Sequence, residues 1–345
     1  MMVMKPSQNV SLADYSTMGL GGSAAYLVAV NTRQEVLEAF NWAAQHQVPA
    51  LMIGGGSNIV WRDEGYQGLV IVNKLLGYEV SDQADCQVLV KVGAGETWDK
   101  VVERTVQAGL TGIEALSLIP GSAGATPVQN VGAYGQEIVN TLDTIEAFDA
   151  QAADFVTLKV SECGFAYRTS RFKTTDHGRF YITSLSLRLT KANPQPPYYG
   201  SVQQYFEEHK ITEVTPAALR EAVIYIRSHK LPDPAKTHNT GSFFGNPIIS
   251  AGELIQLRSK YPDLPAWPLD GGSAKIPAAW LIEQAGFKDA HDPDTGMATW
   301  PTQALVLVNE TAKTTADLLV FKQKIVGAVH DKFGITLVQE PELLP

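Results

Sequence analysis

Three glycine-rich segments could hold the phosphates of a nucleotide without help from charged side chains. They are Gly54 to Asn58, Gly93 to Gly95, and the stretch from Pro120 to Gly135. Glycine lets backbone N–H groups approach a phosphate closely, and several such turns together can surround a pyrophosphate. A dinucleotide is therefore a reasonable ligand, although any one of these segments alone could be only a tight turn. None fits the Rossmann pattern Gly-x-Gly-x-x-Gly or the Walker pattern, so neither of those nucleotide sites is predicted.

Two basic segments could bind an anion. Arg168 and Arg171 stand among aromatic residues between Phe165 and Lys173, and an arginine held by packing offers a fork that suits a carboxylate or a phosphate. Arg227 and Lys230 end a predicted helix, where cations also complement the helix dipole. Segments of this kind are more often solvated basic turns, and the residues alone leave that choice open.

Ser242 is a candidate for acid or hydrogen-bonding chemistry. It lies between Gly241 and two phenylalanines, and no Gly-x-Ser-x-Gly motif surrounds it, so a hydrolase triad is not predicted. A serine beside a glycine most often caps a helix or stabilises a turn, and that interpretation stays open. Near the end of the chain Glu340 and Glu342 supply two carboxylates, which could be solvated.

Strands and helices must position these residues, and the pattern predicts both throughout the chain. Short apolar or alternating runs predict strands at residues 50–53, 68–73, 88–92, 142–148, 180–189 and 335–338. Helical spacing predicts helices after Thr32 with a capping box to Glu35, over 98–106, from Pro216, after Ser250, and over 318–333 with Gly334 at its end. The proline-rich residues 193–197 mark a boundary or a mobile loop.

The composition narrows the class of protein. A chain of 345 residues with 45% hydrophobic and 18% charged residues is long enough for two or three globular domains. Its net charge of −9 argues against broad nucleic-acid binding. Cys86 and Cys163 lack the spacing of a zinc site or a disulfide framework. No apolar run suits a signal peptide or a membrane span, so we expect a cytoplasmic location.

Several motifs in order along the chain resemble the MurB family of UDP-N-acetylenolpyruvoylglucosamine reductases of bacterial cell-wall synthesis. The motifs are Gly54 to Asn58, Gly93-Ala94-Gly95-Glu96-Thr97-Trp98, Ile119 to Gly135, Tyr167-Arg168, Lys230 to Pro234, Gly241 to Asn246, and Glu340-Pro341-Glu342. The resemblance covers nearly the whole chain. Its most specific blocks are the glycine-rich stretch up to Gly135 and the Gly-Ser-Phe-Phe-x-Asn-Pro block around Ser242.

The resemblance implies an α+β fold with three parts. Residues 1–73 and 74–228 would form two subdomains of an FAD-binding domain of the vanillyl-alcohol-oxidase (PCMH) type, with a mobile tyrosine loop near 193–201. Residues 229–345 would form a C-terminal α/β substrate-binding domain, whose last strand returns to the active site. The residues that the resemblance assigns to noncovalent FAD are Gly54, Gly55, Gly56, Ser57, Asn58, Gly93, Gly95, Pro120, Gly121, Ser122, Gly124, Ala125, Gln129, Asn130, Gly132, Ala133, Tyr134 and Gly135.

The same resemblance implies a reaction at one site that serves two steps. NADPH would reduce the flavin and leave, and UDP-N-acetylglucosamine enolpyruvate would then be reduced to UDP-N-acetylmuramate. Arg168 and Glu342 match the residues that hold and polarise the substrate carboxylate, and Ser242 matches the proton donor. The matches to substrate-binding positions are Tyr167, Tyr199, Arg227, Lys230 and Asn246. We expect a monomer that binds a nucleotide sugar, with no nucleic acid, metal or membrane partner.

Two features depart from the family pattern, and two other functions compete with this one. The chain stops three residues after Glu342, where relatives commonly continue with an arginine, and Tyr198 stands beside Tyr199. A flavin oxidase of the same superfamily often binds its flavin covalently through His or Cys, and Gly54 to Asn58 contains neither. A binding protein without catalysis would not need Ser242 and Glu342 at their motif positions.

Overall fold

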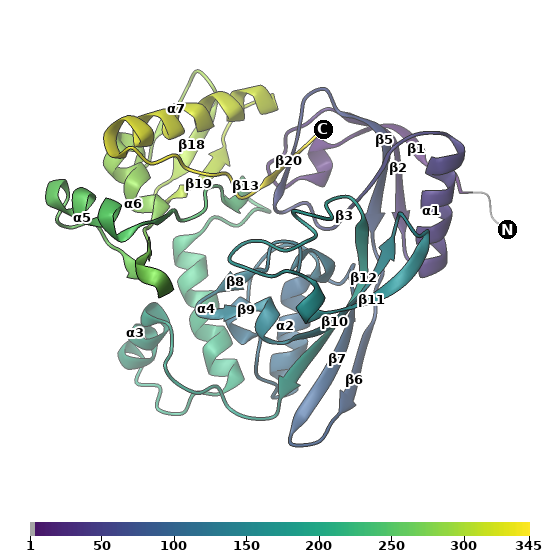
Figure 1. The fold of residues 1–345 in the computed structure, drawn as a ribbon, viewed down its shortest axis with the longest axis horizontal. Helices are drawn as coiled ribbons and strands as arrows, with labels where there is room; N and C mark the ends of the chain where they lie inside the picture. The colour runs from purple at the N-terminus through teal and green to yellow at the C-terminus, as the bar shows by residue number, and fades with distance from the viewer. Residues whose placement is uncertain (1–3) are drawn as a thin grey trace. The chain divides into compact units, whose positions relative to one another are not determined.

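The structure, a computed structural model, describes residues 4–345 and divides into two compact units. Within the described residues, unit 1 consists of residues 4–10, 24–55 and 66–229. Unit 2 consists of residues 11–23, 56–65 and 230–345. Both contain helices and sheets, so the expected α+β class is confirmed (Figure 1).

The N-terminal sheet has four strands in the order β1-β2-β5-β3. Its elements are β1 (Ser7–Ser11), β2 (Ser23–Val30), α1 (Arg33–Gln45), β3 (Ala50–Ile53) and β5 (Tyr66–Asn73). Strands β2 and β3 both run parallel to β5, and residues 68–73 of β5 are all buried, as is usual for a central parallel strand. Helix α1 covers this sheet with Val36, Ala39 and Ala43 (Figure 1).

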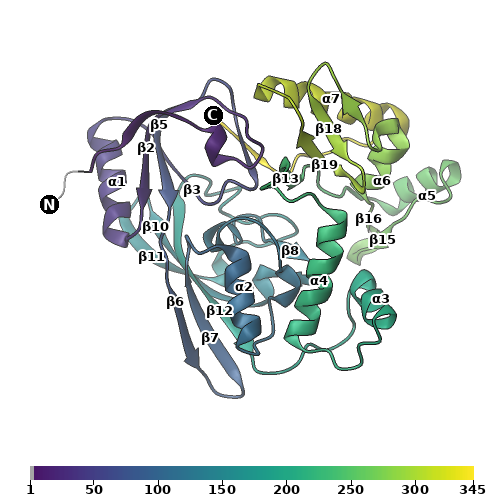
Figure 2. The ribbon, with the colours of Figure 1, turned by 180° about the vertical axis from the view of Figure 1, so that it is seen from behind.

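A second sheet of unit 1 has five antiparallel strands in the order β11-β10-β12-β7-β6. Its elements are β6 (Tyr78–Asp82), β7 (Gln87–Gly93), α2 (Trp98–Gln107), β10 (Leu142–Asp149), β11 (Asp154–Lys159) and β12 (Phe180–Thr190). Helix α2 packs along one face of the sheet, where Trp98, Val101 and Val102 share a core with Val90 and Leu185 (Figure 2). The Trp98 indole N–H also donates to the Leu116 carbonyl at 3.0 Å, which ties α2 to the segment that leads into the glycine-rich stretch.

The rest of unit 1 carries a small hairpin and two helices. These elements are β8 (Gly132–Ala133), β9 (Gln136–Glu137), α3 (Gly200–Glu208) and α4 (Pro216–Lys230), whose last residue already belongs to unit 2. The Thr215 hydroxyl accepts the Ala218 N–H at 3.2 Å, which confirms the predicted start of α4. Helices α3 and α4 share a core formed by Val202, Phe206, Leu219 and Val223.

Unit 2 is built around a four-stranded sheet in the order β13-β19-β18-β17, with a three-stranded sheet in the order β14-β16-β15. Its strands are β4 (Ile59–Trp61), β13 (His238–Ser242), β14 (Ile248–Ile249), β15 (Trp267–Pro268), β16 (Ala274–Lys275), β17 (His291–Asp292), β18 (Met297–Trp300), β19 (Gln303–Asn309) and β20 (Glu342–Leu344). Its helices are α5 (Ala251–Lys260), α6 (Ala278–Ile282) and α7 (Thr315–Phe333). Helix α7 buries Leu318, Phe321 and Ile325 in the same core as Val306 of β19. None of the helices in residues 4–345 is both long and apolar enough to span a membrane.

The predicted strand at residues 335–338 is wrong. The Gly245 N–H donates to the Val338 carbonyl at 3.0 Å, but within residues 4–345 no continuous ladder forms along this segment. The last strand is β20, which pairs in parallel with β4 at Glu342 opposite Ile59. The other predicted strands, the helices and the left-handed Gly334 after α7 are confirmed. At α1, however, only the Thr32 half of the capping box forms, because the Glu35 carboxylate accepts the N–H of Asn31 instead.

Candidate active site

The first and third glycine turns of unit 1 are packed directly against each other. A Cβ atom on Gly54 would lie 2.1 Å from the Ser122 hydroxyl oxygen, and one on Gly55 would lie 3.0 Å from the Gly121 Cα. A Cβ at Gly54 would displace the Ser122 hydroxyl, and one at Gly55 would press against the Gly121 backbone. Glycine at 54 and 55 therefore allows the end of β3 to lie closest to the 120–125 loop.

The second turn is hydrogen-bonded to the third. The N–H groups of Ala123 and Gly124 donate to the carbonyls of Glu96 and Ala94 at 2.8 and 2.9 Å. The Trp98 N–H donates to the Gly121 carbonyl at 3.0 Å, and a Cβ on Gly124 would lie 2.5 Å from the Ala94 Cβ. The structure thus brings together Gly54, Gly55, the 93–95 turn and the 120–125 loop.

This cluster presents backbone donors that no protein carbonyl uses. Within residues 4–345, the N–H groups of Gly55, Gly121 and Ser122 make no backbone hydrogen bond. Neighbouring amides of this kind form anion-binding concavities, which here need no positive side chain. The cluster therefore fits the pyrophosphate of FAD.

The first turn continues into unit 2 at Gly56. This glycine has φ +71°, and a Cβ there would lie 2.3 Å from the Tyr15 carbonyl oxygen, so only glycine is accommodated without strain. Its carbonyl accepts the Thr17 N–H at 3.1 Å. Two residues later the Asn58 carbonyl accepts the N–H of Glu342 at 2.9 Å, which fixes the start of β20 within unit 2.

Around the β8–β9 hairpin, the glycine-rich stretch meets Arg168. The Arg168 guanidinium donates to the Gly132 carbonyl at 2.7 Å and lies 5.4 Å from the centre of the Tyr167 ring. Asn130 is buried and donates to the Glu137 carboxylate and the Ala166 carbonyl at 2.8 and 3.1 Å. The resulting links fix the predicted cofactor segment and the predicted substrate arginine relative to each other within unit 1.

The hairpin is also held by a buried carboxyl group. Glu114 is fully buried and accepts the Gln136 side-chain amide at 3.1 Å and the Gly112 N–H at 2.6 Å. The Gln136 oxygen accepts the Ala115 N–H at 2.8 Å. Burial raises the pKa of Glu114 above its ordinary value, although these hydrogen bonds oppose the shift.

Tyr134, at the hairpin turn, contacts two of the predicted substrate-binding residues. Its hydroxyl lies near the Arg227 guanidinium, and its ring meets the Tyr199 ring edge to face with 5.6 Å between centres. Burial lowers the pKa of Arg227, and burial raises the pKa of Tyr134. Tyr134 therefore connects the predicted FAD segment with residues predicted to contact the nucleotide sugar.

The two adjacent tyrosines before α3 have different surroundings. Tyr198 donates its hydroxyl hydrogen to the Pro194 carbonyl at 3.0 Å and packs against Phe206. Tyr199 is 49% exposed and touches Tyr134. Of the two, Tyr199 is thus the one whose phenol is available to a ligand.

In unit 2, Ser242 ends β13 and is exposed, whereas Phe243 and Phe244 are buried. The Phe243 N–H donates to the Leu305 carbonyl at 2.8 Å, and the two phenyl rings anchor the segment in the core. Two residues before Ser242, the buried Thr240 hydroxyl has no hydrogen-bond partner within residues 4–345. Such unpaired buried hydroxyls are uncommon away from ligand or water sites.

The structure places the remaining predicted residues of unit 2 on neighbouring segments. Asn246 accepts the Ala278 N–H at 2.9 Å and so caps α6 with its side-chain oxygen. Lys230 is exposed at the end of α4, and its carbonyl accepts the Thr302 hydroxyl hydrogen at 2.7 Å. The segments that carry Ser242 and Glu342 lie side by side, since the Glu340 N–H donates to the Phe243 carbonyl at 3.0 Å.

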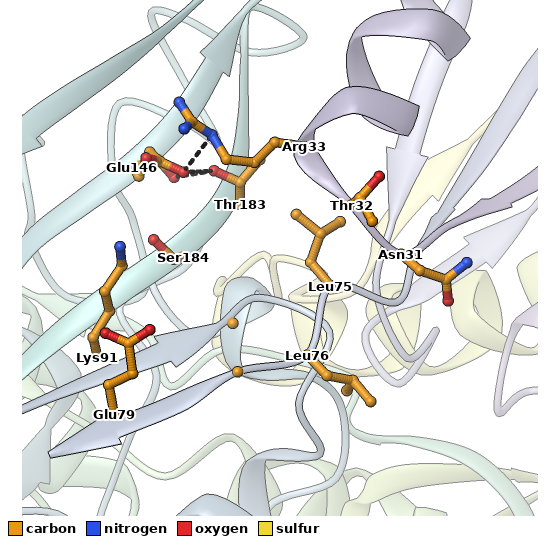
Figure 3. A pocket seen from close by; sticks show the side chains of 12 residues that line it. Asn31, Thr32, Arg33, Leu75, Leu76, Glu79, Lys91, Glu146, Thr183 and Ser184 are labelled. Carbon is orange, nitrogen blue, oxygen red and sulfur yellow. Dashed lines mark hydrogen bonds and ion pairs between the residues drawn. The ribbon is translucent and has the colours of Figure 1, made fainter. Parts of the chain in front are cut away.

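A cavity of about 280 Å³ in unit 1 shares Gly93 with the second glycine turn (Figure 3). Its lining contains Arg33, Lys91, Glu79 and Glu146. Arg33 lies 3.3 Å from the Glu146 carboxylate, which also accepts the Thr183 hydroxyl hydrogen at 2.8 Å (Figure 3). Because the charges of this lining balance, the turn amides are better suited to phosphate than this cavity.

Several residues that organise the site gave no signal in the sequence. Asp99 accepts two hydrogen bonds from Arg220 at 2.6 and 3.0 Å and one from the Leu118 N–H at 2.6 Å, just before the third glycine turn. Because 121 residues separate Asp99 from Arg220, no local pattern could have paired them. Glu114 is similar, since a glutamate in an apolar segment reveals no partner until the fold is known.

Comparison with known proteins identifies the family. Residues 24–157 match the family described as FAD binding domain, and residues 233–344 match the UDP-N-acetylenolpyruvoylglucosamine reductase C-terminal domain. The reductase of Pseudomonas putida is 38% identical over 99% of this chain and 100% of its own. That of Thermobifida fusca is 40% identical over 98% of each chain, and that of Escherichia coli K12 is 37% identical over 97% of this chain and 95% of its own.

A solved structure supports the same fold. The chain is similar to the reductase from Thermus caldophilus with a TM-score of 0.69 and 24% identity, covering 99% of this chain and 100% of the other. With relatives of 36–40% identity over nearly its whole length, and with both parts of the chain matched, this protein belongs to the UDP-N-acetylenolpyruvoylglucosamine reductase family.

Proposed function

We propose that this chain reduces UDP-N-acetylglucosamine enolpyruvate to UDP-N-acetylmuramate, with FAD as noncovalent cofactor and NADPH as the source of hydride. The product would serve peptidoglycan synthesis. The observation that carries the proposal is the cluster of glycine turns with unused backbone donors, in a chain that belongs to this reductase family. Gly55, Gly121 and Ser122 would hold the FAD pyrophosphate. Bound FAD would accept hydride from NADPH and pass it on to the enolpyruvyl substrate.

Arg168 and Glu342 would hold the substrate carboxylate. When hydride adds to the terminal methylene carbon of the enolpyruvyl group, negative charge develops on the neighbouring carbon and its carboxylate, and a fixed donor such as the Arg168 guanidinium stabilises such charge. The hydrogen bond from Arg168 to the Gly132 carbonyl uses one end of the guanidinium and orients the rest. The backbone bond of Glu342 to Asn58 sets the position of its carboxyl group.

Ser242 would donate the proton that completes the reduction. Its hydroxyl proton would pass to the carbon that carries the developing charge, next to the carboxylate. A hydroxyl of high pKa can serve because that carbon is itself strongly basic. Exposure of Ser242, on a segment anchored by two buried phenylalanines, suits a group that must meet a substrate and then regain its proton from water.

The nucleotide sugar would be bound by Tyr167, Tyr199, Arg227, Lys230 and Asn246. Tyr199 and Arg227 are supported by their common contact with Tyr134. Asn246 uses its oxygen for the Ala278 N–H, which leaves its amide nitrogen for a ligand. The other predicted cofactor residues, including Gln129 and Gly135, keep their predicted role.

The proposal includes a cytoplasmic monomer that has no nucleic-acid partner. An acidic chain of net charge −9 lacks the surface that a polyanion needs. The division into residues 1–73, 74–228 and 229–345 stays a prediction. These domains are defined by the ligand that each would bind, whereas the two compact units are defined by contacts between residues.

The test is the absorption spectrum of the purified protein. We expect a flavin spectrum that NADPH bleaches and that UDP-N-acetylglucosamine enolpyruvate then restores without oxygen. UDP-N-acetylglucosamine, which lacks the enolpyruvyl group, is the control and should restore nothing. A protein that binds no flavin, or a reduced flavin that the substrate leaves bleached, would contradict the proposal.

A further inference from the structure

The C-terminal segment of unit 2, residues 338–344, runs past the Ser242 segment before it pairs with β4. The Gly245 N–H donates to the Val338 carbonyl at 3.0 Å, and the Glu340 N–H donates to the Phe243 carbonyl at 3.0 Å. After Pro341, the Glu342 N–H donates to the Asn58 carbonyl at 2.9 Å. The chain therefore changes its backbone partner between Glu340 and Glu342.

At that change of partner, the Gln339 side chain bridges two elements. Its amide nitrogen donates to the Pro341 carbonyl at 2.7 Å, and its oxygen accepts a hydrogen bond from the Lys322 ammonium on α7 at 3.2 Å. An ammonium group can only donate, so Lys322 fixes which end of the Gln339 amide faces Pro341. The Lys322 and Gln339 pair thus locks the peptide directly before Glu342 onto a long helix.

Lys322 occupies a costly position for a lysine. It is partly buried, and this burial together with the positive charge of Arg62 lowers its pKa below the ordinary value. The nearby Arg62 repels the Lys322 ammonium, so covering apolar surface alone would not account for a lysine at this position. Its ammonium instead donates to Gln339, which lies in the C-terminal segment.

We propose that Lys322 and Gln339 are positioning residues for the Glu342 carboxylate. Both act through the Pro341 peptide, and neither touches substrate. The inference rests on the proposed function, because it takes Glu342 as a residue that holds and polarises the substrate carboxylate.

The experiment measures the two half-reactions separately in Lys322→Met and Gln339→Leu. We expect the reoxidation of reduced flavin by the enolpyruvyl substrate to slow by about tenfold, while flavin reduction by NADPH changes less than about twofold. Lys322→Arg, which keeps a donor, should recover most of the rate. Lys324→Met is the matched control, since Lys324 lies on the same helix but pairs with Asp292. Unchanged reoxidation in both test variants would overturn the inference.

Gln339→Glu separates positioning from simple attachment of the tail. The carboxylate keeps, and strengthens, the contact with Lys322 but cannot donate to the Pro341 carbonyl, so we expect the same slow reoxidation as in Gln339→Leu. Full activity in Gln339→Glu would mean that attachment to α7 is enough, which would overturn the role of the Pro341 contact. This isosteric variant also serves if the leucine variant does not fold.

A double variant distinguishes failure of this inference from failure of the proposed function. In a Glu342→Gln background, Gln339→Leu should add almost nothing to the loss of rate, because the group that it positions is already gone. A full additional loss would show a purely structural effect and overturn the inference. If Glu342→Gln alone leaves reoxidation unchanged, the proposed role of Glu342 is wrong, and the inference falls with it.

Discussion

Ser242 lies exposed at the end of β13, and its own contacts do not reveal a chemical role. The proposed role of proton donor comes from the motif around it, and the structure shows why the motif contains these residues. Gly241 has φ +71°, and the two phenylalanines after Ser242 are buried. Glycine and two aromatic residues together turn the chain and pin it, so the hydroxyl stays outside the core.

We predict that Ser242→Ala leaves flavin reduction by NADPH nearly unchanged and slows reoxidation by the enolpyruvyl substrate by about two orders of magnitude or more. Only the second half-reaction needs an acid. Stopped-flow measurement of flavin absorbance in each half would check this. Equal losses in both halves would contradict the role of proton donor.

We predict that Tyr134→Phe raises the KM for the enolpyruvyl substrate by about tenfold, because the Arg227 guanidinium loses the polar phenol group beside it, a change of about 1.5 kcal/mol. The phenyl ring keeps its contact with Tyr199. Steady-state kinetics with a measurement of bound flavin would check both. Loss of flavin with unchanged KM would instead favour the direct cofactor contact expected from the sequence.

Among the elements, the glycine turns are held together by close backbone packing more than by side-chain contacts. A Cβ on Gly124 would lie 2.5 Å from the Ala94 Cβ, so the turns could not stay in contact. We predict that Gly124→Ala weakens FAD binding by about tenfold or more and destabilises the fold by about 1–3 kcal/mol. Flavin titration and chemical unfolding would measure the two effects.

Gly252→Ala is the matched control for that variant. Gly252 lies in α5, and no atom within 4 Å would meet its Cβ, so stability should stay equal or rise slightly. FAD binding in this control should equal that of the wild type. If both variants bind FAD as the wild type does, close packing of the turns is not what holds the cofactor.

The hydrogen bonds between Asp99 of α2 and Arg220 of α4 make the stability of the fold depend on pH, and the sign of this dependence can be worked out. Burial acts to raise the pKa of Asp99, but hydrogen bonds from Arg220 and the Leu118 N–H outweigh it, and the net pKa is lowered. A carboxyl whose pKa is lowered by folding stabilises the fold above its unfolded pKa of about 3.9, and loses that contribution as the pH falls through the folded value.

We therefore predict that Asp99→Asn costs about 1–2 kcal/mol at pH 7 and little at pH 2–3. The free energy of unfolding of wild type and variant, measured in urea from pH 7 down to pH 2, should converge. A constant difference over this range would mean that the carboxylate charge contributes nothing.

Sequence patterns predicted these elements well where neighbouring residues decide the structure. The cap at Thr32, the start of α4 at Pro216 and the strand before Gly54 are all local features, and all are confirmed. The failures involve distant partners. Residues 335–338 carry an apolar run typical of a strand, yet a strand needs a neighbour, and β4 is in register only with residues 342–344. The candidate site followed the same rule, since motifs located its residues but not Asp99, Arg220 or Glu114.

For the whole molecule, the glycine turns predict noncovalent FAD, since neither His nor Cys occurs in Gly54 to Asn58. We predict that acid precipitation leaves a colourless pellet and a yellow supernatant. Absorbance of the two fractions near the flavin maximum would check this. Colour that stays with the pellet would contradict noncovalent binding and favour the oxidase alternative.

Unit 2 is discontinuous along the chain, and this affects how the molecule can come apart. Its core contains Met18, Leu20 and Val60, and its last strand pairs with β4, so residues 230–345 alone lack part of their own interior. A single proteolytic cut after residue 229 would therefore not release a stable C-terminal fragment. The chain also passes through unit 2 twice before residue 66. Local unfolding that starts at either end of the chain would therefore soon remove residues from the core of unit 2.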